Sequence, residues 1–406
     1  MDFDLLIIGG GMVGATLACA LGDTPLRIAV VEAHEAQTEW PEEGFDIRVS
    51  AITRATQRVF EVVGAWEGMA QRRVCPYQHM HVWDATGSGS IDFDAADIGE
   101  PDLGLIVENR VILAALLERM AAFDNVELFC PARVGELERS ADGVSLTLED
   151  GRTLRARVIV GADGANSWVR EQAGIDTTGW AYDQTAVVAT IKTSRHHQET
   201  CWQRFMPSGP LAFLPLPGGY SSIVWSTTPE RAAELVEMDE SRFLDQLQLA
   251  FGDKLGRMES TGPRGAFPLL LRHANRYSDE RLVLVGNAAH AIHPLAGQGL
   301  NLGVSDVAAL AEVLLQAQQD GQDIGELAVL RRYERWRKAD NVAVMAAMDG
   351  FKRLFSNDNG ALKLLRNAGL KLADRALPAK NLLIRRAMGL SGDLPRLSRS
   401  QPLSSL

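Results

Sequence analysis

The first thirty-two residues constrain the fold of this 406-residue chain more than any other segment. They begin with MDFDLLIIGGGMVGATLACAL and close with RIAVVE. The apolar run Leu5–Ile8 predicts a strand that is buried on both faces, and a helix continues over Ala15–Leu21. A second buried strand follows at Ile28–Val31 and ends at Glu32. A strand, a glycine turn, a helix and a second strand in this order predict an α/β fold.

The glycines of the turn have the G-x-G-x-x-G spacing. Gly9 permits the tight turn, Gly11 lets the backbone approach a pyrophosphate, and Gly14 lets the helix pack close to the strand. The helix N-terminus presents unpaired N–H groups to the phosphates, and Glu32 is placed to accept hydrogen bonds from a ribose. We therefore predict a Rossmann-like domain that binds an ADP-containing dinucleotide. This segment alone does not choose between NAD and FAD.

Composition sets limits on the class of protein. The length suggests two domains or one elaborated domain, and the net charge of −11 argues against nucleic acid as a general partner. The four cysteines are far apart and are expected to be reduced thiols of a cytosolic protein. The acidic N-terminus is not typical of a signal peptide, and we expect no apolar run of the roughly twenty residues that a membrane span needs.

Two arginines lie near the predicted nucleotide turn. Arg48 is either an ordinary surface charge or a contact to a phosphate or flavin. Ser50 is expected to cap a helix that runs to about Val63. Arg110 falls in the first turn of a helix predicted from Asn109, where a positive charge opposes the helix dipole, so another group is expected to hold it.

The middle of the chain predicts a second, inserted domain. Strand-like segments recur between residues 180 and 270, with Pro-Gly-Gly turns and one charged helix from about Glu230 to Phe251. We expect a mostly antiparallel sheet there and a helical C-terminus. We predict a discontinuous nucleotide-binding domain that covers residues 1–78, 107–178 and 272–350. The sheet domain covers 79–106 and 179–271, and a helical basic tail covers 351–406.

Two further segments are expected to face a ligand. In GADGANSWVR, Asp163 and Gly164 follow a buried strand, where α/β folds bind ligands, although an Asx turn would also explain the aspartate. In GNAAHAIHPLAGQGLNLG, a glycine-rich loop precedes a helix that starts near Asn301, which suggests a backbone surface against a flat ring. His290 and His293 could suggest a metal site or a catalytic base, but no other ligand pattern supports a metal, and we predict none.

The glycine turn GGGMVG with Glu32, then GADGANSWVR and then GNAAHAIHPLAGQGLNLG resemble, in this order, three sequence fingerprints of one family. This family is the class A aromatic flavoprotein monooxygenases, such as para-hydroxybenzoate hydroxylase. The resemblance runs nearly end to end and is strongest to the ubiquinone-biosynthesis hydroxylases, in particular the 2-polyprenylphenol hydroxylases. It includes the segments RVSAI, VEN, AFLPL, RRYERWRK and GLKLAD. It implies a Rossmann-like FAD-binding domain with an inserted, mostly antiparallel substrate sheet.

The resemblance also implies roles for individual residues. The ADP half of FAD would be held by the glycine turn and Glu32, and Arg48 and Arg110 would contact the flavin or its phosphates. Asp163 and Gly164 would belong to the motif linked to both FAD and the reduced nicotinamide donor. The isoalloxazine ring would be lined by Pro294, Gly297, Gln298, Gly299, Leu300 and Asn301.

The implied activity is a monooxygenase reaction that uses FAD, O₂ and NADPH or NADH. A polyprenylated phenol of ubiquinone biosynthesis would be hydroxylated on its ring, at C5 as the first choice, through a flavin C4a-hydroperoxide. We name no catalytic side chain, because the flavin carries the chemistry. An apolar and aromatic set in the inserted sheet agrees with such a substrate, although such residues are core in most sheets: Trp202, Phe205, Phe213, Leu214 and Trp225. The alternatives are an FAD-dependent hydroxylase or oxidase of another aromatic compound and a non-catalytic FAD-binding subunit of a ubiquinone-biosynthesis complex.

One position departs from the family pattern. Where Gly-Asp is most frequent, this chain has Gly286-Asn287. The family's aspartate accepts a hydrogen bond from the ribityl chain, which an amide oxygen can also do. Asparagine lacks the charge, so we expect a difference in flavin affinity or redox potential.

The C-terminal tail differs in charge from the rest of the chain. From Phe351 onward it carries eleven basic and three acidic residues, within a chain of net charge −11. It either docks on the acidic body as terminal helices or forms a basic amphipathic surface that meets anionic lipid or a partner complex. The second alternative would place the protein in the cytoplasm, peripherally at the inner membrane face.

Overall fold

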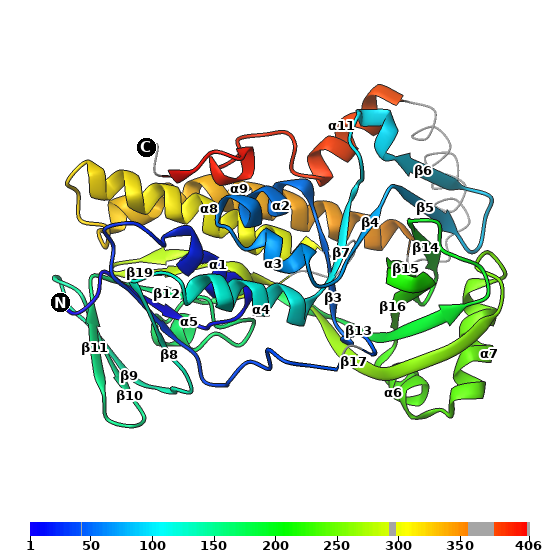
Figure 1. Ribbon diagram of the computed structural model, residues 1–406, viewed down its shortest axis with the longest axis horizontal. Helices are drawn as coiled ribbons and strands as arrows, with labels where there is room; N and C mark the ends of the chain where they lie inside the picture. The colour runs from blue at the N-terminus through cyan, green and yellow to red at the C-terminus, as the bar shows by residue number, and fades with distance from the viewer. Residues whose placement is uncertain (42, 292–297, 356–376, 404–406) are drawn as a thin grey trace.

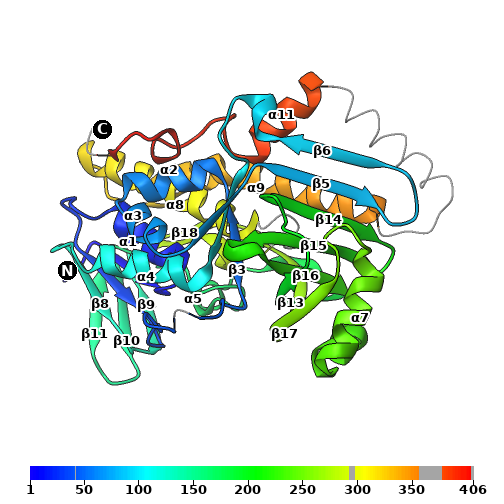
Figure 2. The ribbon, with the colours of Figure 1, turned by 45° about the vertical axis from the view of Figure 1, so that its right-hand side comes forward.

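The computed structural model describes residues 1–41, 43–291, 298–355 and 377–403 (Figure 1). A lobe that contains the N-terminus lies at one end of the molecule, and a lobe built on a large sheet lies at the other (Figures 1 and 2). The two long helices α8 (Gln298–Gln319) and α9 (Leu327–Phe355) run side by side, and α9 extends from the first lobe towards the second.

The first lobe is organised by a six-stranded sheet in the order β18-β19-β12-β1-β2-β8. All neighbouring strands are parallel except β18, which pairs antiparallel with β19. This confirms the predicted strands at both ends of the first segment. The strands are β1 (Leu5–Ile8), β2 (Ile28–Val31), β8 (Val126–Phe129), β12 (Val158–Gly161), β18 (Ser278–Asp279) and β19 (Leu282–Leu284).

Helices pack on this sheet because their apolar faces share one core with it. Leu17 of α1 (Met12–Ala20), Leu116 of α4 (Asn109–Met120) and Leu310 of α8 are fully buried with the strands. A three-stranded antiparallel sheet adds Leu146 to the same core. Its strands are β9 (Val134–Arg139), β10 (Val144–Leu148) and β11 (Thr153–Ala156).

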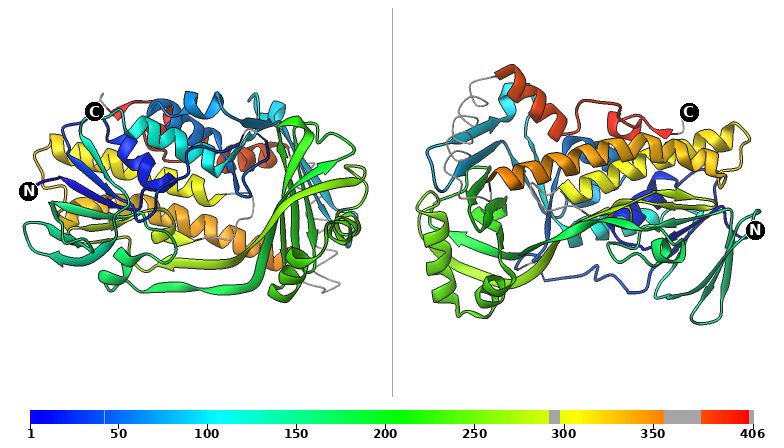
Figure 3. Two further views of the ribbon diagram at one scale, coloured as in Figure 1. Left: turned by 60° about the horizontal axis from the view of Figure 1, so that its bottom comes forward. Right: turned by 180° about the vertical axis from the view of Figure 1, so that it is seen from behind.

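The second lobe is an eight-stranded sheet in the order β20-β17-β13-β16-β15-β14-β5-β6, mostly antiparallel (Figure 3). Helices α6 (Pro229–Glu237) and α7 (Glu240–Phe251) cover one face of it with a separate apolar core. The strands are β5 (His79–Asp84), β6 (Ser90–Asp94), β13 (Thr177–Thr193), β14 (Thr200–Met206), β15 (Gly209–Leu216), β16 (Tyr220–Thr227), β17 (Met258–Ala274) and β20 (His290–Ala291). The expected antiparallel sheet is present, with β14 and β5 as its parallel pair.

A small antiparallel sheet, β3-β7-β4, accompanies the remaining helices. Its Ile106 and Ala51 share an apolar cluster with Leu216 of the large sheet, so it connects the two lobes. The elements are β3 (Val49–Ile52), β4 (Val74–Tyr77), β7 (Gly104–Glu108), α2 (Arg54–Val62), α3 (Trp66–Ala70) and α5 (Trp168–Gln172).

Two expected local structures were wrong. Ser50 does not cap a helix: it is buried in β3 and its hydroxyl donates to Asn109 Oδ1 at 2.7 Å, whereas Thr53 caps α2. The single charged helix is two helices, because the side chain of Asp239 accepts from Arg242 N and starts α7 as a new helix.

The predicted limit at 78/79 coincides with the start of β5, whereas the limit at 178/179 lies inside β13 and three others also fall inside elements. The limit at 106/107 lies inside β7, and the one at 271/272 lies inside β17. The limit at 350/351 lies inside α9. β20 belongs to the large sheet although it lies in the third nucleotide-binding segment. The division into domains therefore stays a prediction.

The described part of the C-terminal tail docks on both lobes: Leu397 and Leu403 pack in the core of the first lobe, and α11 (Leu377–Ala387) packs on the second. In α11 the buried Lys380 pairs with Asp97 at 3.1 Å, and Arg385 donates to the carbonyl of Ile98 at 2.9 Å. Ile384 packs in the same apolar cluster. The basic residues Lys363, Arg366, Lys371 and Arg375 lie outside the described residues.

One helix departs from the expectation about apolar runs. Within the described helices, Gly299–Gln319 of α8 is long and apolar enough to cross a membrane by length and composition. Most of it is buried inside the molecule, between α1 and α9, so its apolar character matches its place in the core. All four cysteines are free thiols, as expected.

Candidate functional site

The glycine turn after β1 has the geometry that its spacing predicts. Gly9 has φ of +102°, and a Cβ there would lie 2.6 Å from the carbonyl oxygen of Ala162. A Cβ on Gly14 would lie 1.9 Å from the Gly9 carbonyl oxygen, so α1 approaches the turn closely. The backbone roles of Gly9 and Gly14 are confirmed, and their contact with a cofactor stays a prediction.

Gly11 has a different reason to be glycine. It is the N-cap of α1, and no side chain caps the helix there. A Cβ added to Gly11 would meet no atom within 4 Å. The N-terminus of α1 therefore has no side-chain cap and has open space beside Gly11, which is the arrangement that a phosphate group needs at a helix N-terminus.

Two more segments converge on this turn. The backbone of Gly286, at the end of β19, has φ of +56°, and a Cβ there would be 3.2 Å from Val13 of α1. A Cβ on Gly303 of α8 would be 2.8 Å from the same valine and 3.3 Å from the Gly286 Cα. The Gly286 turn and α8 therefore pack closely together around Val13, the second residue of α1.

Glu32 braces the turn. Its Oε2 accepts from Gly10 N at 2.8 Å, and its Oε1 accepts from His34 N at 3.0 Å. A carboxylate has about four acceptor positions, so these bonds leave room for a hydroxyl donor. The side chain is 25% exposed, which keeps the predicted ribose contact sterically open.

The two arginines occupy different surroundings. Arg110 is held by the buried carboxylate of Glu108, with Nη2 2.7 Å from Oε2, and it lies over the ring of Trp40. This confirms that another group, the Glu108 carboxylate, compensates for the unfavourable interaction of Arg110 with the helix dipole. Arg48 is exposed, and its guanidinium lies 5.3 Å from the ring centre of Phe267 on β17. Contact of either arginine with a flavin stays a prediction.

The second motif is built around a capping carboxylate. Asp163 accepts from the Ser167 hydroxyl at 2.5 Å and from Val169 N at 3.0 Å, so it braces the start of α5 rather than forming the Asx turn of the simpler alternative. Burial raises the pKa of Asp163, although these hydrogen bonds oppose the shift. Gly164 has φ of +82°, and a Cβ on it would meet nothing within 4 Å.

An arginine that was not predicted links this motif to the Gly286 turn. Arg170 is buried and donates to the carbonyl oxygens of Ala165 and Ala288, at 2.8 and 2.9 Å. Burial lowers its pKa, and the neighbouring Arg272 adds to the effect. The sequence gives a weak signal for this role, because Arg170 is simply a charge within a short helix.

The predicted ring-lining residues divide into three groups. Pro294 and Gly297 lie outside the described residues. Gln298, Gly299 and Leu300 form the first turn of α8, and a Cβ on Gly299 would meet nothing within 4 Å. Asn301 is buried, where its amide accepts from Thr53 N at 3.0 Å and donates to the Ala51 carbonyl at 2.8 Å. This side chain therefore ties α8 to β3.

Asn287 is exposed and lies in the turn that follows β19. Behind this turn, Asp306 accepts from Gly286 N at 3.2 Å and from His290 Nε2 at 2.5 Å. His290 thus has a carboxylate partner rather than a metal environment, and His293 lies outside the described residues. Within the described ranges no three His, Cys, Asp or Glu side chains are grouped to hold a metal ion.

The residues present fit an ADP-containing cofactor. The open N-terminus of α1 at Gly11 suits a pyrophosphate, and Glu32 at the end of β2 suits a ribose. The Gly286 turn and α8 approach α1 closely at Val13, so they lie beside this helix. When bound, FAD would be held by these elements and would supply the redox chemistry.

Comparison with known proteins agrees with this geometry. Residues 2–347 match the family model described as FAD binding domain. The ubiquinone hydroxylase UbiL of Rhodospirillum rubrum is 42% identical over 403 residues, covering 98% of this chain and 93% of that protein. The 3-demethoxyubiquinol 3-hydroxylase of Escherichia coli is 38% identical and covers 95% of this chain and 98% of its own.

A solved structure supports the same assignment. PqsL, a probable FAD-dependent monooxygenase from Pseudomonas aeruginosa, superposes with a TM-score of 0.76 at 26% identity, over 91% of this chain and 99% of that one. The chain is therefore an FAD-dependent monooxygenase that belongs to the FAD-binding-domain family, among the ubiquinone-biosynthesis hydroxylases.

Proposed function

We propose that this enzyme hydroxylates the aromatic ring of a polyprenylated phenol in ubiquinone biosynthesis. The observation that carries the proposal is the full-length similarity to proteins named for ubiquinone hydroxylation, combined with the open cradle at Gly11. C5 remains our first choice of ring carbon. The name of the Escherichia coli relative refers to position 3 of a demethoxyubiquinol, which makes that position the second choice.

The cofactor would supply oxygen transfer, with the hydroperoxide route as our expectation, and the protein would position the ring and exclude water. The large sheet has two different faces for this task. Trp202, Phe213 and Trp225 pack in the core under α6 and α7, so they are not available to a substrate. Leu214 and Tyr220 belong to the opposite side, in the cluster that joins the small sheet.

The substrate is therefore expected on the Leu214 side. Successive residues of a strand point to opposite faces, which explains why Phe213 and Leu214 separate. Phe45 stacks near Tyr220, with ring centres 5.3 Å apart, and Lys192 lies 4.4 Å from the Tyr220 ring centre. An apolar and aromatic surface between the two lobes suits a phenol with a hydrocarbon tail.

The electron donor and surroundings are part of the proposal. We propose NADPH or NADH as the donor and O₂ as the oxidant. We further propose a cytoplasmic enzyme that works peripherally at the inner membrane, where a prenylated substrate dissolves, alone or within a ubiquinone-biosynthesis complex. The basic tail is the candidate contact.

Deletion of the gene tests the proposal directly. A deletion strain should lose ubiquinone and accumulate a precursor that lacks one ring hydroxyl, and its mass and fragmentation would assign the carbon. Normal ubiquinone without a precursor would overturn the proposal.

The purified protein then separates the alternatives. A ring hydroxylase consumes NAD(P)H faster in the presence of the phenol and forms a hydroxylated product. An oxidase would convert its substrate without incorporating oxygen, and a non-catalytic subunit would bind FAD but show no turnover.

A further inference from the structure

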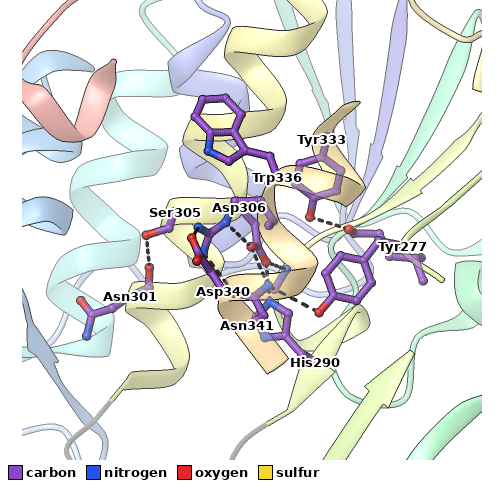
Figure 4. A network of polar contacts seen from close by, with 12 residues as sticks. Tyr277, His290, Asn301, Ser305, Asp306, Tyr333, Trp336, Asp340 and Asn341 are labelled. Carbon is purple, nitrogen blue, oxygen red and sulfur yellow. Dashed lines mark hydrogen bonds and ion pairs between the residues drawn. The ribbon is translucent and has the colours of Figure 1, made fainter. Parts of the chain in front are cut away.

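One buried carboxylate, Asp306, lies in a network of polar contacts next to the Gly286 turn (Figure 4). Asp306 of α8 has no exposed surface. Its Oδ2 receives Gly286 N and His290 Nε2 at 3.2 and 2.5 Å, and its Oδ1 receives Arg337 Nε and Asn341 Nδ2 at 3.1 and 3.0 Å. Four donors thus meet on two oxygens.

These donors come from separate parts of the chain. Gly286 begins the turn that carries Asn287. His290 opens β20, which ends immediately before residues 292–297, and α8 begins immediately after them at Gln298. The Oδ2 atom therefore connects the turn with both flanks of the predicted ring-lining segment, whereas Oδ1 connects α8 with α9.

The charges of the group agree with a fixed arrangement. Burial alone would raise the pKa of Asp306, but His290, Arg337 and Asn341 outweigh it and hold the pKa below its usual value. Asp306 is therefore ionised and only accepts, so His290 Nε2 carries the proton that it donates. His290 Nδ1 is buried and has no hydrogen-bond partner within the described chain, so the hydrogen bond that orients the ring is the one from Nε2 to Asp306.

We propose that Asp306 is a positioning residue for the flavin, which acts through Gly286 and His290. It holds the Gly286 turn, which is expected to face the ribityl chain, at a fixed position relative to the two ends of the predicted ring-lining segment. The proposal rests on the FAD site described above and goes beyond it, because Asp306 itself is completely enclosed by protein.

A second carboxylate provides a matched control. Asp323, in the connection between α8 and α9, pairs with Arg281 at 2.6 Å and Arg157 at 3.2 Å. It binds the connection between these helices to Arg157 and Arg281. Within the described residues it has no bond to the Gly286 turn or to β20. Asp323→Asn should therefore lower stability without changing the flavin.

Asp306→Asn is the first test. An amide has one acceptor oxygen and one NH₂ donor, so at least one of the N–H groups around position 306 would face another donor. We expect FAD, titrated by fluorescence into the FAD-free protein, to bind at least tenfold more weakly, or about 1.4 kcal/mol. At saturating FAD, the visible absorption bands and flavin fluorescence should also differ from those of the wild type. Asp323→Asn should match the wild type in affinity and spectrum.

Substitutions of His290 keep the test decisive if Asp306→Asn does not fold. His290→Gln places an amide N–H close to the Nε2 position and should preserve affinity and spectrum, whereas His290→Leu removes the donor and should reproduce the weak binding. Wild-type affinity and spectrum in His290→Leu would overturn the proposal. So would equal changes in Asp306→Asn and Asp323→Asn, which would show a general stability effect.

These readouts use no aromatic substrate. A protein that passes them but hydroxylates no polyprenylated phenol would overturn the proposed function and leave the role of Asp306 in place.

Discussion

Replacing Gly11 should separate cofactor binding from folding. Gly11 has φ of −68° and ψ of −177°, which any residue can adopt, and its Cβ position is open. We therefore expect Gly11→Val to lower the free energy of unfolding of the FAD-free protein by no more than about 1 kcal/mol. The valine side chain would occupy the space where a phosphate should meet the first N–H groups of α1.

The cost to binding follows from the contacts that are blocked. A hydrogen bond to a charged group contributes about 1.5–3 kcal/mol. Loss of a single one at the N-terminus of α1 would weaken FAD binding about 10- to 150-fold. The purified variant should be folded and colourless, whereas the wild type should be yellow with about one FAD per chain, which is our expectation for a single site.

Gly14→Ala is the matched comparison. In an ordinary helix this change would stabilise by about 1 kcal/mol. Here the new Cβ would lie 1.9 Å from the carbonyl oxygen of Gly9, so the backbone must shift. We expect a net loss of about 1–3 kcal/mol in the FAD-free protein, together with weaker FAD binding.

Urea unfolding of the FAD-free proteins and fluorescence titration with FAD measure the two effects. Gly11→Val with wild-type FAD affinity would refute the placement of the phosphate. Equal losses of stability in both variants would show that Gly11 has a packing role that its open surroundings do not predict.

Four further predictions concern other parts of the molecule. Asn287→Asp should retain FAD and shift its reduction potential modestly, whereas Asn287→Leu should weaken binding by about 0.5–1.5 kcal/mol in the same titration, for loss of one hydrogen bond. Burial lowers the pKa of His273 to about 4, so the unfolded chain binds more protons than the folded one between about pH 4 and 6.5. The free energy of unfolding should therefore fall as the pH falls through that window. In urea unfolding at several pH values, His273→Gln should make this pH dependence weaker. Lys380→Gln should lower the free energy of unfolding by about 1.5–3 kcal/mol, because the ion pair with Asp97 is lost. Arg386 is exposed. Arg386→Gln should leave stability unchanged but reduce co-sedimentation with anionic vesicles about fivefold, for about 1 kcal/mol per basic residue. Equal sedimentation of the wild type and the variant with anionic and neutral vesicles would contradict a role of the basic tail at the membrane.

Local patterns predicted the parts of the site that depend on a few consecutive residues. The strand, turn and helix from Leu5 to Ala20 follow from apolar runs and glycine spacing, and the structure confirms them. Thr53 was missed as the cap of α2 because Ser50, three residues earlier, is also a good cap in isolation. Only pairing of β3 with β7 decides between them, and that pairing joins residues far apart in the sequence.

Tertiary contacts decided what the sequence did not reveal. Asp306 and Arg337 are 31 residues apart and meet only because α8 and α9 pack side by side. Asn301 was expected beside the flavin ring, but its amide bonds to the backbone on either side of Ile52. Similarly, Lys380 was one of many basic tail residues, and only the packing of α11 distinguishes it as a buried ion-pair partner.

The asparagine at position 287 has a physical consequence in this setting. The family pattern places a carboxylate at the front of the Gly286 turn, and here that position is neutral. The carboxylate behind the turn, Asp306, is still present and is neutralised by Arg337 at 3.1 Å. The turn can therefore keep its geometry through Gly286 N while the charge that would face the cofactor is lost. Asn287 should therefore change the reduction potential of the flavin and leave its position unchanged. A substitution of Asp306 should instead change the position of the flavin.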